Sequence, residues 1–420
     1  MPRTRLELEN DFRAVLAAGS ARAATPSDAF GTFQPRLVIE PANEAELAVA
    51  LRLANDAGVA VVPRGGGTKL IWGNPPARAD VVLSTVRLNK IIEHVWADLT
   101  VSVEAGCTVA NLQAALAQHG QRLAVDSLWP QKATIGGILS ANDSGALRLR
   151  FGALRDLILG VTIALPDGTV ASSGGKVVKN VAGYDLPKLV TGALGTLGVI
   201  TRAVFRLHPL PHHAKTMSIF PTNVAEAHQV LSAVQDSNLA HTSLQLRAAH
   251  DAASIVDVLF EGTQEGIAAQ VEQLKSLAAS ARTEESSPVA WNACQHLWDS
   301  VDSVAVAKLT SLPASIADTI EQVRRIASYH NVTWRSVIQG TGVGSLRLNG
   351  DSKNLHECLK TLRAELERSG GSLVLQHRPA NMPSFEAWGM PGDALPLMRA
   401  IKKQFDPKST LNSGRFVGGI

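Results

Sequence analysis

The chain has 420 residues, of which 45% are hydrophobic and 18% are charged, and its 40 basic and 37 acidic residues leave a formal net charge of +3. This composition excludes a disordered chain, and a near-neutral charge without a basic block argues against a nucleic-acid-binding protein. The length predicts about two to three domains, with a core that needs no disulfide or structural metal.

The cysteines and the N-terminal segment indicate a reducing compartment. Cys107, Cys294 and Cys358 are odd in number and far apart, which excludes a disulfide framework and a CxxC metal site. Acidic residues and Arg22 interrupt the N-terminal segment, so it is a poor secretory signal. No window approaches about 18 consecutive apolar residues, and no transmembrane helix is expected. We therefore expect a cytoplasmic protein.

The first half of the chain predicts helices and strands that alternate with glycine-rich loops. Asn43 caps a helix whose apolar residues recur at helical spacing until Gly58 ends it, and a short buried strand then leads into the loop at 64–68. Further predicted elements are strands at Val81–Thr85, Thr100–Ala105, Leu157–Leu165, Gly198–Thr201 and Ala203–Leu207, and helices capped by Thr108 and Asp185.

A proline-containing stretch, His208–His213, marks the boundary to a second region, because prolines break regular structure. Beyond it, two rounds of strands followed by an Ala-rich helix predict an α+β cap, of which a ferredoxin-like arrangement is one form. The predicted elements are strands at Leu244–Leu246, Ser254–Phe260, Val332–Ile338, Ser345–Leu348 and Ser372–Gln376, and helices at Gly266–Ala279 and Asn354–Arg368. The final segment, Met398–Phe416, predicts a helix and an ordered tail that docks on the first domain.

Three glycine-rich stretches are the candidate functional motifs. In Pro63-Arg-Gly-Gly-Gly-Thr68, successive backbone N–H groups can converge on one anion beside basic side chains, so a diphosphate site and a tight turn are equally good explanations. Thr134-Ile-Gly-Gly137, followed by Asn142-Asp-Ser-Gly145, fits a flat ring or a phosphate, although a packing turn explains it more often. Gly192–Gly198 is typical of close packing.

Several common enzyme signatures do not occur in the sequence. There is no G-x-G-x-x-G motif of a Rossmann site and no P-loop lysine motif. There is also no H-E-x-x-H motif of a zincin and no G-x-S-x-G motif of an α/β-hydrolase.

A set of short motifs follows in one order along residues 35–210 and at the C-terminus. The set is Pro63-Arg-Gly-Gly-Gly-Thr68, Val103-Glu-Ala-Gly106, Thr134-Ile-Gly-Gly137, Asn142-Asp-Ser-Gly145, Arg150–Gly160, Leu165-Pro-Asp-Gly168, Gly183-Tyr-Asp-Leu186, Gly195–Thr201, Phe405-Asp-Pro407 and Leu411-Asn-Ser-Gly-Arg415. Each motif is common alone, but the ordered set resembles the FAD domain of the vanillyl-alcohol oxidase/PCMH superfamily. Within that superfamily the chain most resembles the FAD-binding E subunits of glycolate oxidase complexes.

The resemblance implies an α+β fold, in which a PCMH-type FAD-binding domain is followed by a smaller α+β cap. We expect an N-terminal helical segment at 1–33 and the FAD-binding domain at 34–211. The cap is expected at 212–385, and a C-terminal segment at 386–420 is expected to return to the FAD-binding domain.

The resemblance also implies which residues bind FAD. The loop at 64–68 would cradle the pyrophosphate, Thr134 and its glycines would face the flavin and phosphates, and Val199 and Ile200 would meet the adenine end. Arg415 or Asn412 would approach the flavin from the tail. The implied cofactor-binding residues are Arg64, Gly65, Gly66, Gly67, Thr68, Lys69, Pro130, Thr134, Ile135, Gly136, Gly137, Asn142, Ser144, Gly145, Val199, Ile200 and Arg415.

The attachment of FAD is expected to be non-covalent. Covalent attachment in this superfamily often uses a His near the first glycine loop, and the stretch from Arg64 to Leu70 has none. Cys107 is an unlikely substitute, because a small packed residue is the commoner role for a Cys in a strand-to-helix turn.

The sequence departs from the related D-2-hydroxy-acid dehydrogenases in the cap. Those enzymes carry His-x-Gly-Asp-Gly-Asn and Glu-His-Gly-Ile-Gly motifs that supply metal ligands and a base. The corresponding stretches here are Gln339–Gly344 and either Gln376–Pro379 or Phe385–Gly389, so we expect no metal site and name no catalytic residue. His377 and Arg378 could take a proton and clamp a carboxylate, but a solvated strand end is the simpler interpretation.

The leading hypothesis is therefore an FAD-dependent oxidoreductase that forms the FAD-binding subunit of a glycolate oxidase and works with a catalytic flavoprotein chain and an iron–sulfur chain. The complex would convert glycolate to glyoxylate and lie peripheral to the inner membrane only through its partners. Alternatives are a self-sufficient D-lactate or glycolate dehydrogenase, a non-catalytic FAD-binding scaffold and, more weakly, a reductase of cell-wall precursor synthesis. The sequence does not distinguish glycolate from D-lactate.

Two further groups of residues have plainer explanations. His208, His212 and His213 suggest a metal cluster by number, but the prolines between them favour a solvated linker. Three tryptophans in or near the cap suit a partner interface, although core packing is the commoner role for each. They are Trp291, Trp298 and Trp388.

Overall fold

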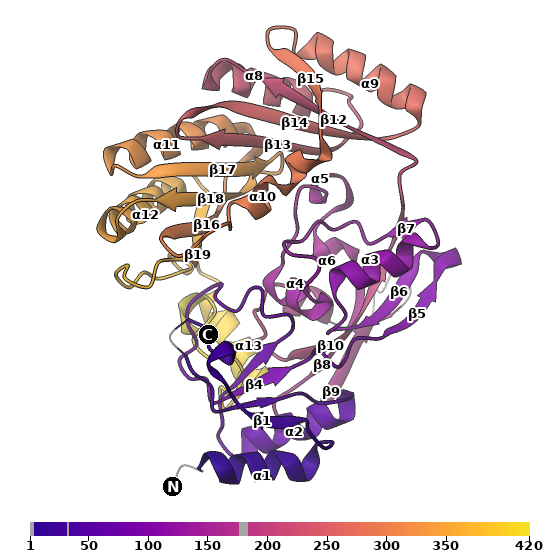
Figure 1. Cartoon of the computed structure of the whole chain (residues 1–420), viewed down its shortest axis with the longest axis vertical. Helices are drawn as coiled ribbons and strands as arrows, with labels where there is room; N and C mark the ends of the chain where they lie inside the picture. The colour runs from indigo at the N-terminus through magenta and orange to yellow at the C-terminus, as the bar shows by residue number, and fades with distance from the viewer. Residues whose placement is uncertain (1–3, 32, 176–183) are drawn as a thin grey trace. The chain divides into compact units, whose positions relative to one another are not determined.

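The computed structural model describes residues 4–31, 33–175 and 184–420, and the chain divides into two units (Figure 1). Unit 1 comprises Met1–Ser144, Ala153–Leu210 and Met390–Ile420. Unit 2 comprises Gly145–Gly152 and Pro211–Gly389. The fold is α+β, as predicted.

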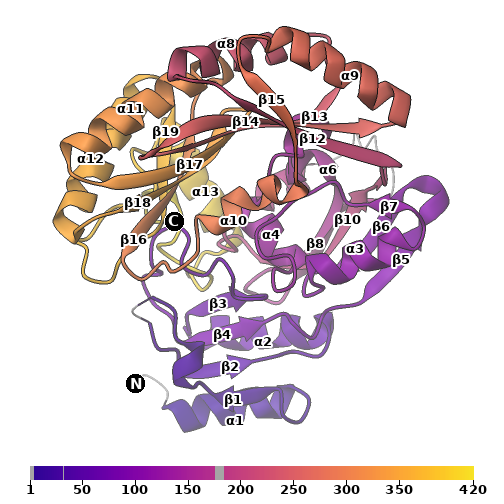
Figure 2. The ribbon, with the colours of Figure 1, turned by 45° about the horizontal axis from the view of Figure 1, so that its top comes forward.

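The first sheet of unit 1 has four strands in the order β1-β2-β4-β3, of which β2, β4 and β3 are mutually parallel. The strands are β1 (Ala21–Ala23), β2 (Leu37–Ile39), β3 (Val61–Arg64) and β4 (Val81–Ser84). Helices α1 (Arg5–Val15) and α2 (Glu44–Asp56) pack together beside this sheet (Figure 2). Phe12 and Leu51 are fully buried in their shared core, because apolar residues recur at helical spacing on one face of each helix.

The second sheet of unit 1 has five antiparallel strands in the order β5-β6-β10-β8-β9. They are β5 (Ile91–Val95), β6 (Thr100–Glu104), β8 (Ile158–Ala164), β9 (Val170–Gly174) and β10 (Val199–Arg206), and a separate pair joins β7 (Gln121–Arg122) to β11 (His208–Pro209). The helices of this part are α3 (Val109–Ala117), α4 (Ile135–Ala141), α6 (Leu154–Leu157), α7 (Leu186–Val190) and, from the C-terminal segment, α13 (Leu395–Phe405).

Unit 2 is built on an eight-stranded antiparallel sheet in the order β15-β12-β14-β13-β17-β18-β16-β19. The strands are β12 (His213–Phe220), β13 (His241–Ala249), β14 (Ala252–Gly262), β15 (Arg282–Ser286), β16 (Val304–Thr310), β17 (Thr333–Gln339), β18 (Val343–Asn349) and β19 (Ser372–His377). The helices are α5 (Arg148–Phe151), α8 (Val224–Gln235), α9 (Gln264–Leu277), α10 (Ala293–His296), α11 (Ile316–Tyr329) and α12 (Ser352–Arg368).

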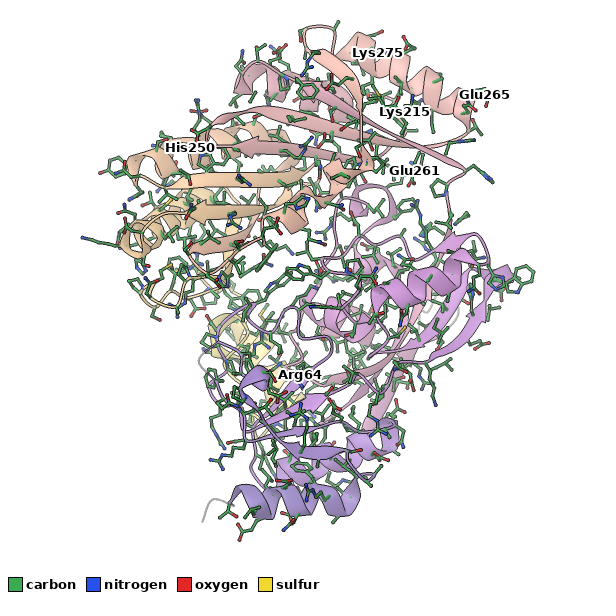
Figure 3. All side chains as sticks on the ribbon, viewed as in Figure 1. Arg64, Lys215, His250, Glu261, Glu265 and Lys275 are labelled. Carbon is green, nitrogen blue, oxygen red and sulfur yellow. The ribbon has the colours of Figure 1, made fainter. Side chains whose placement is uncertain are left out.

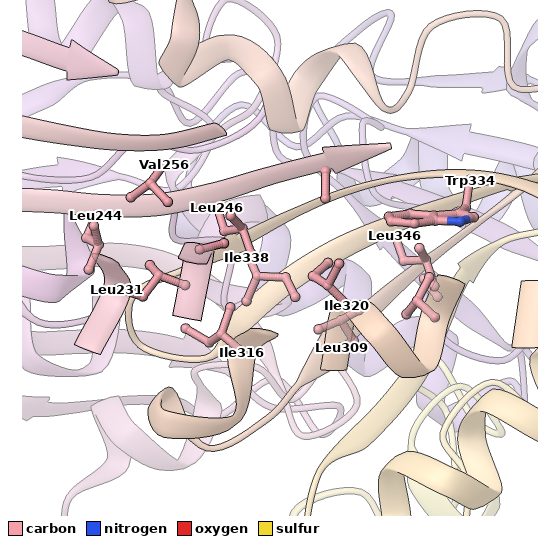
Figure 4. Close-up of a cluster of buried hydrophobic side chains, with 14 of the residues drawn as sticks. Leu231, Leu244, Leu246, Val256, Leu309, Ile316, Ile320, Trp334, Ile338 and Leu346 are labelled. Carbon is pink, nitrogen blue, oxygen red and sulfur yellow. The ribbon is translucent and has the colours of Figure 1, made fainter. Parts of the chain in front are cut away.

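The core of unit 2 lies between this sheet and helices α8, α9, α11 and α12. Leu244, Leu246 and Ile338 from the strands pack there against Leu231 and Ile320 from the helices (Figure 4). Since strand residues alternate between the two faces, the intervening residues of β13 and β17 lie on the opposite face, which is largely polar. The two predicted strand-and-helix rounds are both present, but they are joined in one wide sheet.

The structure differs from the sequence prediction in several elements. The stretch 198–207, predicted as two strands, forms the single strand β10 with a bulge near Arg202, so no turn separates the halves. The division between the units falls inside the boundary predicted at 208–213, but that stretch is not only linker, because it contains β11 and the first residue of β12. The N-terminal segment is not only helical, because it adds β1 to the first sheet. Gly183, which belongs to one quoted motif, lies outside the described residues.

Candidate cofactor site

A cavity of about 650 Å³ in unit 1 gathers residues from segments that are distant in the sequence. Its walls come from the loop after β3, the end of β4, the helix α4, the loop that leads into β10 and the C-terminal tail. The lining residues are Pro63, Arg64, Gly65, Gly66, Gly67, Thr68, Lys69, Leu70, Thr85, Thr134, Gly136, Gly137, Ser140, Ala141, Leu194, Gly195, Gly198, Val199, Ile200, Asn412 and Arg415.

The glycine loop after β3 owes its shape to a close approach. A Cβ on Gly65 would lie 2.0 Å from Thr134 Oγ1, and one on Gly66 would lie 1.7 Å from the Lys132 carbonyl oxygen. Only glycine allows the loop to pack this tightly against the segment that begins α4. The N–H groups of Gly66 and Gly67 have no acceptor within the described part of the chain, so both remain available to a bound group.

Arg64, at the end of β3, is held by a buried carboxylate. Asp28 is 4% exposed, and its Oδ1 lies 3.1 Å from Arg64 Nη1. Arg22 donates to both oxygens of the same carboxylate, at 2.7 and 2.9 Å, and Thr25 donates its backbone N–H and its hydroxyl. The Arg22 guanidinium holds the pKa of Asp28 well below its usual value. Asp28 is shared by two guanidinium groups, so it offsets the charge of Arg64 only in part, and the orientation of Arg64 depends on the N-terminal segment.

Lys69 is also paired. Its Nζ lies 3.0 Å from Asp143 Oδ2, and both residues are less than a tenth exposed. The Trp72 and Trp129 rings lie 5.6 and 5.2 Å from the Nζ, at distances typical of cation–π contacts. This ion pair ties the glycine loop to the turn after α4. Both cations predicted to attract phosphate therefore contact a carboxylate, which Lys69 has as its ion-pair partner and Arg64 shares with Arg22.

The C-terminal tail is fixed by a second buried ion pair. Lys402 in α13 donates to Asp406 Oδ2 at 2.6 Å and to the carbonyl oxygens of Thr196 and Leu411. The Asp406 carboxylate accepts the backbone N–H groups of Thr410 and Leu411, both at 2.8 Å. Burial lowers the pKa of Lys402. These contacts explain the Phe-Asp-Pro motif, because the Asp places the residues that follow it.

The tail then runs parallel to β3 and brings two polar side chains to the cavity. Leu411 forms a parallel bridge with Val61, and Asn412 donates its Nδ2 to the Leu194 carbonyl oxygen at 2.6 Å. Asn412 Oδ1 is buried and has no hydrogen-bond partner within the described ranges. Arg415 donates to the carbonyl oxygens of Leu70 and Trp72, and burial lowers its pKa to about 10.

The structure brings together most of the residues that were predicted from the sequence to bind the cofactor. Twelve of the seventeen line the cavity, and they are Arg64, Gly65, Gly66, Gly67, Thr68, Lys69, Thr134, Gly136, Gly137, Val199, Ile200 and Arg415. Pro130, Ile135, Asn142, Ser144 and Gly145 do not line it. The last of these belongs to unit 2, whereas the Ser144 hydroxyl accepts the Leu154 N–H and so holds the adjoining loop.

The sequence missed several lining residues. Leu194, Gly195 and Gly198 belong to the stretch that was interpreted as close packing; both glycines are closely packed, and they also line the cavity. The positive φ of +69° at Gly195, beside Asn412, could not be inferred from spacing alone. Asn412 itself lies in the C-terminal motif, and the signal that identifies it is the buried Asp406 that orients the tail.

Other candidate residues have structural contacts. Cys107 is buried, and burial raises its pKa. His377 Nε2 lies 2.8 Å from the Val301 carbonyl oxygen, and Arg378 donates to the carbonyl oxygens of Met382 and Pro383. Trp291 donates to Thr216 Oγ1 at 2.9 Å. Trp298 is buried, and Trp388 packs against the core of unit 2.

The described ranges hold neither a metal-binding cluster nor a membrane-spanning helix. No three His, Cys, Asp or Glu side chains there gather closely enough to hold a metal ion. Within the same ranges, no helix is both long and apolar enough to span a membrane.

Comparison with known proteins identifies the first unit. Residues 35–174 match the family described as the FAD binding domain. The glycolate oxidase subunit GlcD of Bacillus subtilis is 25% identical over 416 residues, covering 91% of this chain and 88% of that protein. The D-lactate dehydrogenase of Archaeoglobus fulgidus is 27% identical over 408 residues, covering 91% of each. The structure of p-cresol methylhydroxylase superposes with a TM-score of 0.80 at 15% identity, covering 98% of this chain and 96% of that one, and shares the fold.

The cavity, the family match and the shared fold together define the chain as an FAD-dependent oxidoreductase. Residues 35–174 are its FAD binding domain, and the whole chain shares the fold of p-cresol methylhydroxylase. The residues present fit FAD: free N–H groups in the glycine loop suit a phosphate, and the unpartnered Asn412 Oδ1 suits an N–H of a ring system.

Proposed function

We propose that this chain is the FAD-binding subunit of a glycolate oxidase, an assembly that oxidises glycolate to glyoxylate. The observation that carries the proposal is the single cavity in which the glycine loops and the C-terminal tail meet. The relatives matched over nine-tenths of the chain are named as a glycolate oxidase subunit and a D-lactate dehydrogenase, and a third is named as a D-2-hydroxyglutarate dehydrogenase. These names share an α-hydroxy acid, and FAD, when bound, supplies the electron acceptor for its oxidation.

Non-covalent binding of FAD is part of the proposal. None of the residues that line the cavity is a His, Cys or Tyr, the side chains that could form a bond to the flavin. Arg64 and Lys69 are oriented by Asp28 and Asp143, so they would shape the loop, while its N–H groups would meet the phosphates. Asn412 would accept from the ring system, and Arg415 would add positive charge beside it.

The subunit role rests on the cap. We place the metal-ligand motifs of the related dehydrogenases at Gln339–Gly344 and at either Gln376–Pro379 or Phe385–Gly389. Gln339 and Gln376 are buried amides, and the polar groups of His377 and Arg378 contact main-chain carbonyl oxygens at the end of β19 and in the loop that follows it. We therefore assign substrate oxidation in the assembly to a catalytic flavoprotein chain, with an iron–sulfur chain to pass on the electrons.

A second candidate function is a self-sufficient D-2-hydroxy-acid dehydrogenase. The observation in its favour is that the similarity to the D-lactate dehydrogenase covers both proteins almost entirely, cap included. On this hypothesis the isolated chain reduces its own flavin with substrate.

Anaerobic titration of the purified, FAD-loaded chain distinguishes the two functions. Glycolate, D-lactate and D-2-hydroxyglutarate are added in turn while the visible flavin absorbance is followed, first to the chain alone and then with the two partner chains. The subunit proposal expects no bleaching by the chain alone and bleaching in the assembly. Bleaching of the isolated chain would establish the second function. Acid precipitation should leave the yellow colour in the supernatant, and flavin that stays with the pellet would contradict non-covalent binding.

A further inference from the structure

A second cavity, of about 800 Å³, lies in unit 2 at the turn between β13 and β14. It is separate from the cofactor site and is lined by residues of that turn, of the start of β17 and of the end of β18. Figure 3 labels His250, which belongs to the turn. The polar lining residues are His250, Asp251, Thr333, Arg335, Arg347 and Asn349.

Two arginines stand side by side in this cavity. Arg335 and Arg347 are direct partners in the antiparallel register of β17 and β18, so their side chains leave the same face of the sheet. Side chains in such a pair have Cβ atoms about 4.5–5.5 Å apart, and like charges there destabilise the sheet. Arg335 has no carboxylate partner in any of the described ranges. The Asp299 carboxylate acts on Arg347 and opposes the effect of Arg335 on its pKa, so one negative charge faces two arginines.

Arg347 is held in place, whereas Arg335 is exposed. The Arg347 guanidinium donates to the carbonyl oxygens of Leu297, Asp299 and Ser300, so its orientation is fixed by main chain. Burial lowers the pKa of Arg347, and the charge of Arg335 lowers it further. A fixed guanidinium next to an exposed one is an arrangement that recognises oxyanions through paired N–H groups.

Neighbouring groups add hydrogen-bonding capacity. His250 Nδ1 is buried and, within the described part of the chain, has no hydrogen-bond partner. Thr333 and Asn349, which pair with each other across β17 and β18, add a hydroxyl and an amide to the lining. Asp251 is the one acidic residue among those that line the cavity. Its side chain is 87% exposed, so solvent screens its charge.

We propose that this cavity binds a small oxyanion with two negative charges, a phosphate ester or a dicarboxylate, between Arg335 and Arg347. The anion supplies further negative charge, while His250, Thr333 and Asn349 offer further polar contacts at the rim. The proposal does not rest on the proposed oxidation function, because no residue of this lining belongs to the cofactor cavity.

Calorimetric titration of the FAD-loaded chain with pyrophosphate and, separately, with succinate tests the proposal. Loading with FAD first keeps the phosphate probe out of the cofactor cavity. The variant is Arg335→Gln, which removes one charge from an exposed side chain without a partner. The matched control is Arg324→Gln on α11, which removes the same charge from the same unit but away from the cavity.

We expect one or both probes to bind, and we expect Arg335→Gln to weaken binding about tenfold while Arg324→Gln leaves it unchanged. Binding of pyrophosphate alone assigns a phosphate ester, and binding of succinate alone assigns a dicarboxylate. Absence of heat with both probes up to millimolar concentrations would overturn the proposal, as would equal weakening by the two variants, which would reveal only a general charge effect. A melting curve of Arg335→Gln confirms that any loss reflects binding and not unfolding.

Discussion

The two units bury charge in different settings. In unit 2, the fully buried Asp257 accepts from Ser218, Gln245 and both ends of the Arg247 guanidinium, on three strands that backbone ladders already fix. In unit 1, Asp406 and Asp28 hold a tail and a loop that no wide sheet supports. The comparison indicates that backbone hydrogen bonds keep a sheet in shape without the buried carboxylate. A site made from loops lacks such bonds, so its shape depends on the carboxylate.

The largest expected effect tests this contrast directly. Asp406→Ala leaves the buried Lys402 ammonium without its partner, which costs about 3–5 kcal/mol of unfolding free energy, and it also releases the tail that carries Asn412. Asp257→Ala should cost a similar amount of unfolding free energy, because it leaves the Arg247 guanidinium without its carboxylate partner. Only Asp406→Ala should abolish FAD binding, as measured by retained flavin absorbance after desalting. If Asp257→Ala loses FAD equally, the contrast between the units is wrong.

A smaller effect is expected from Asp28→Asn. The substitution weakens charge-assisted hydrogen bonds to Arg22 and Arg64 and should cost about 1.5–3 kcal/mol at neutral pH. Because the folded pKa of Asp28 is depressed, its stabilisation is complete above about pH 4 and is lost as the pH falls toward the folded pKa. Unfolding curves should therefore depend less on pH below about pH 4 in the variant than in the native chain, and identical pH profiles would contradict the role of this pair.

Gly66→Ala sharpens the comparison without altering any charge. The new Cβ would lie 1.7 Å from the Lys132 carbonyl oxygen, a backbone atom, so the loop must move. We expect a loss of about 1–3 kcal/mol together with weaker FAD binding, measured by fluorescence titration of the unloaded chain. Gly392→Ala is the control in the same unit, because nothing lies within 4 Å of its added Cβ. Equal effects of the two variants would remove the steric argument.

The smallest expected effect is a difference in the reactivity of the three cysteines, which depends on how tightly each is packed in its unit. Burial raises the pKa of Cys107 in unit 1 and raises that of Cys358 in unit 2 to about 12, whereas Cys294 is half-buried. At pH 8 a thiol reagent should therefore modify Cys294 first, with the other two reacting only in denaturant. Rapid modification of Cys107 in the native chain would show that the turn before α3 is looser than the structure indicates.

The sequence predicted the glycine loop and the family from the order of short motifs, and it predicted the helices that have clear caps, such as the one capped by Asn43. It could not predict that Arg64 and Lys69 are paired with carboxylates, because Asp28 and Asp143 are ordinary residues in the sequence and become partners only in the fold. It also interpreted Gly195 as packing, since its place beside Asn412 depends on a contact between segments more than two hundred residues apart.

The path of the tail also has a consequence for biosynthesis. Arg415 donates to Leu70 across 345 positions of sequence. At about 5–20 residues per second, the ribosome needs on the order of half a minute to make the chain between them. During that interval the glycine loop exists without the residues that close its cavity. Cofactor loading is therefore a late event that follows synthesis of the last helix, and the yield of holoprotein depends on how much free FAD the newly released chain encounters.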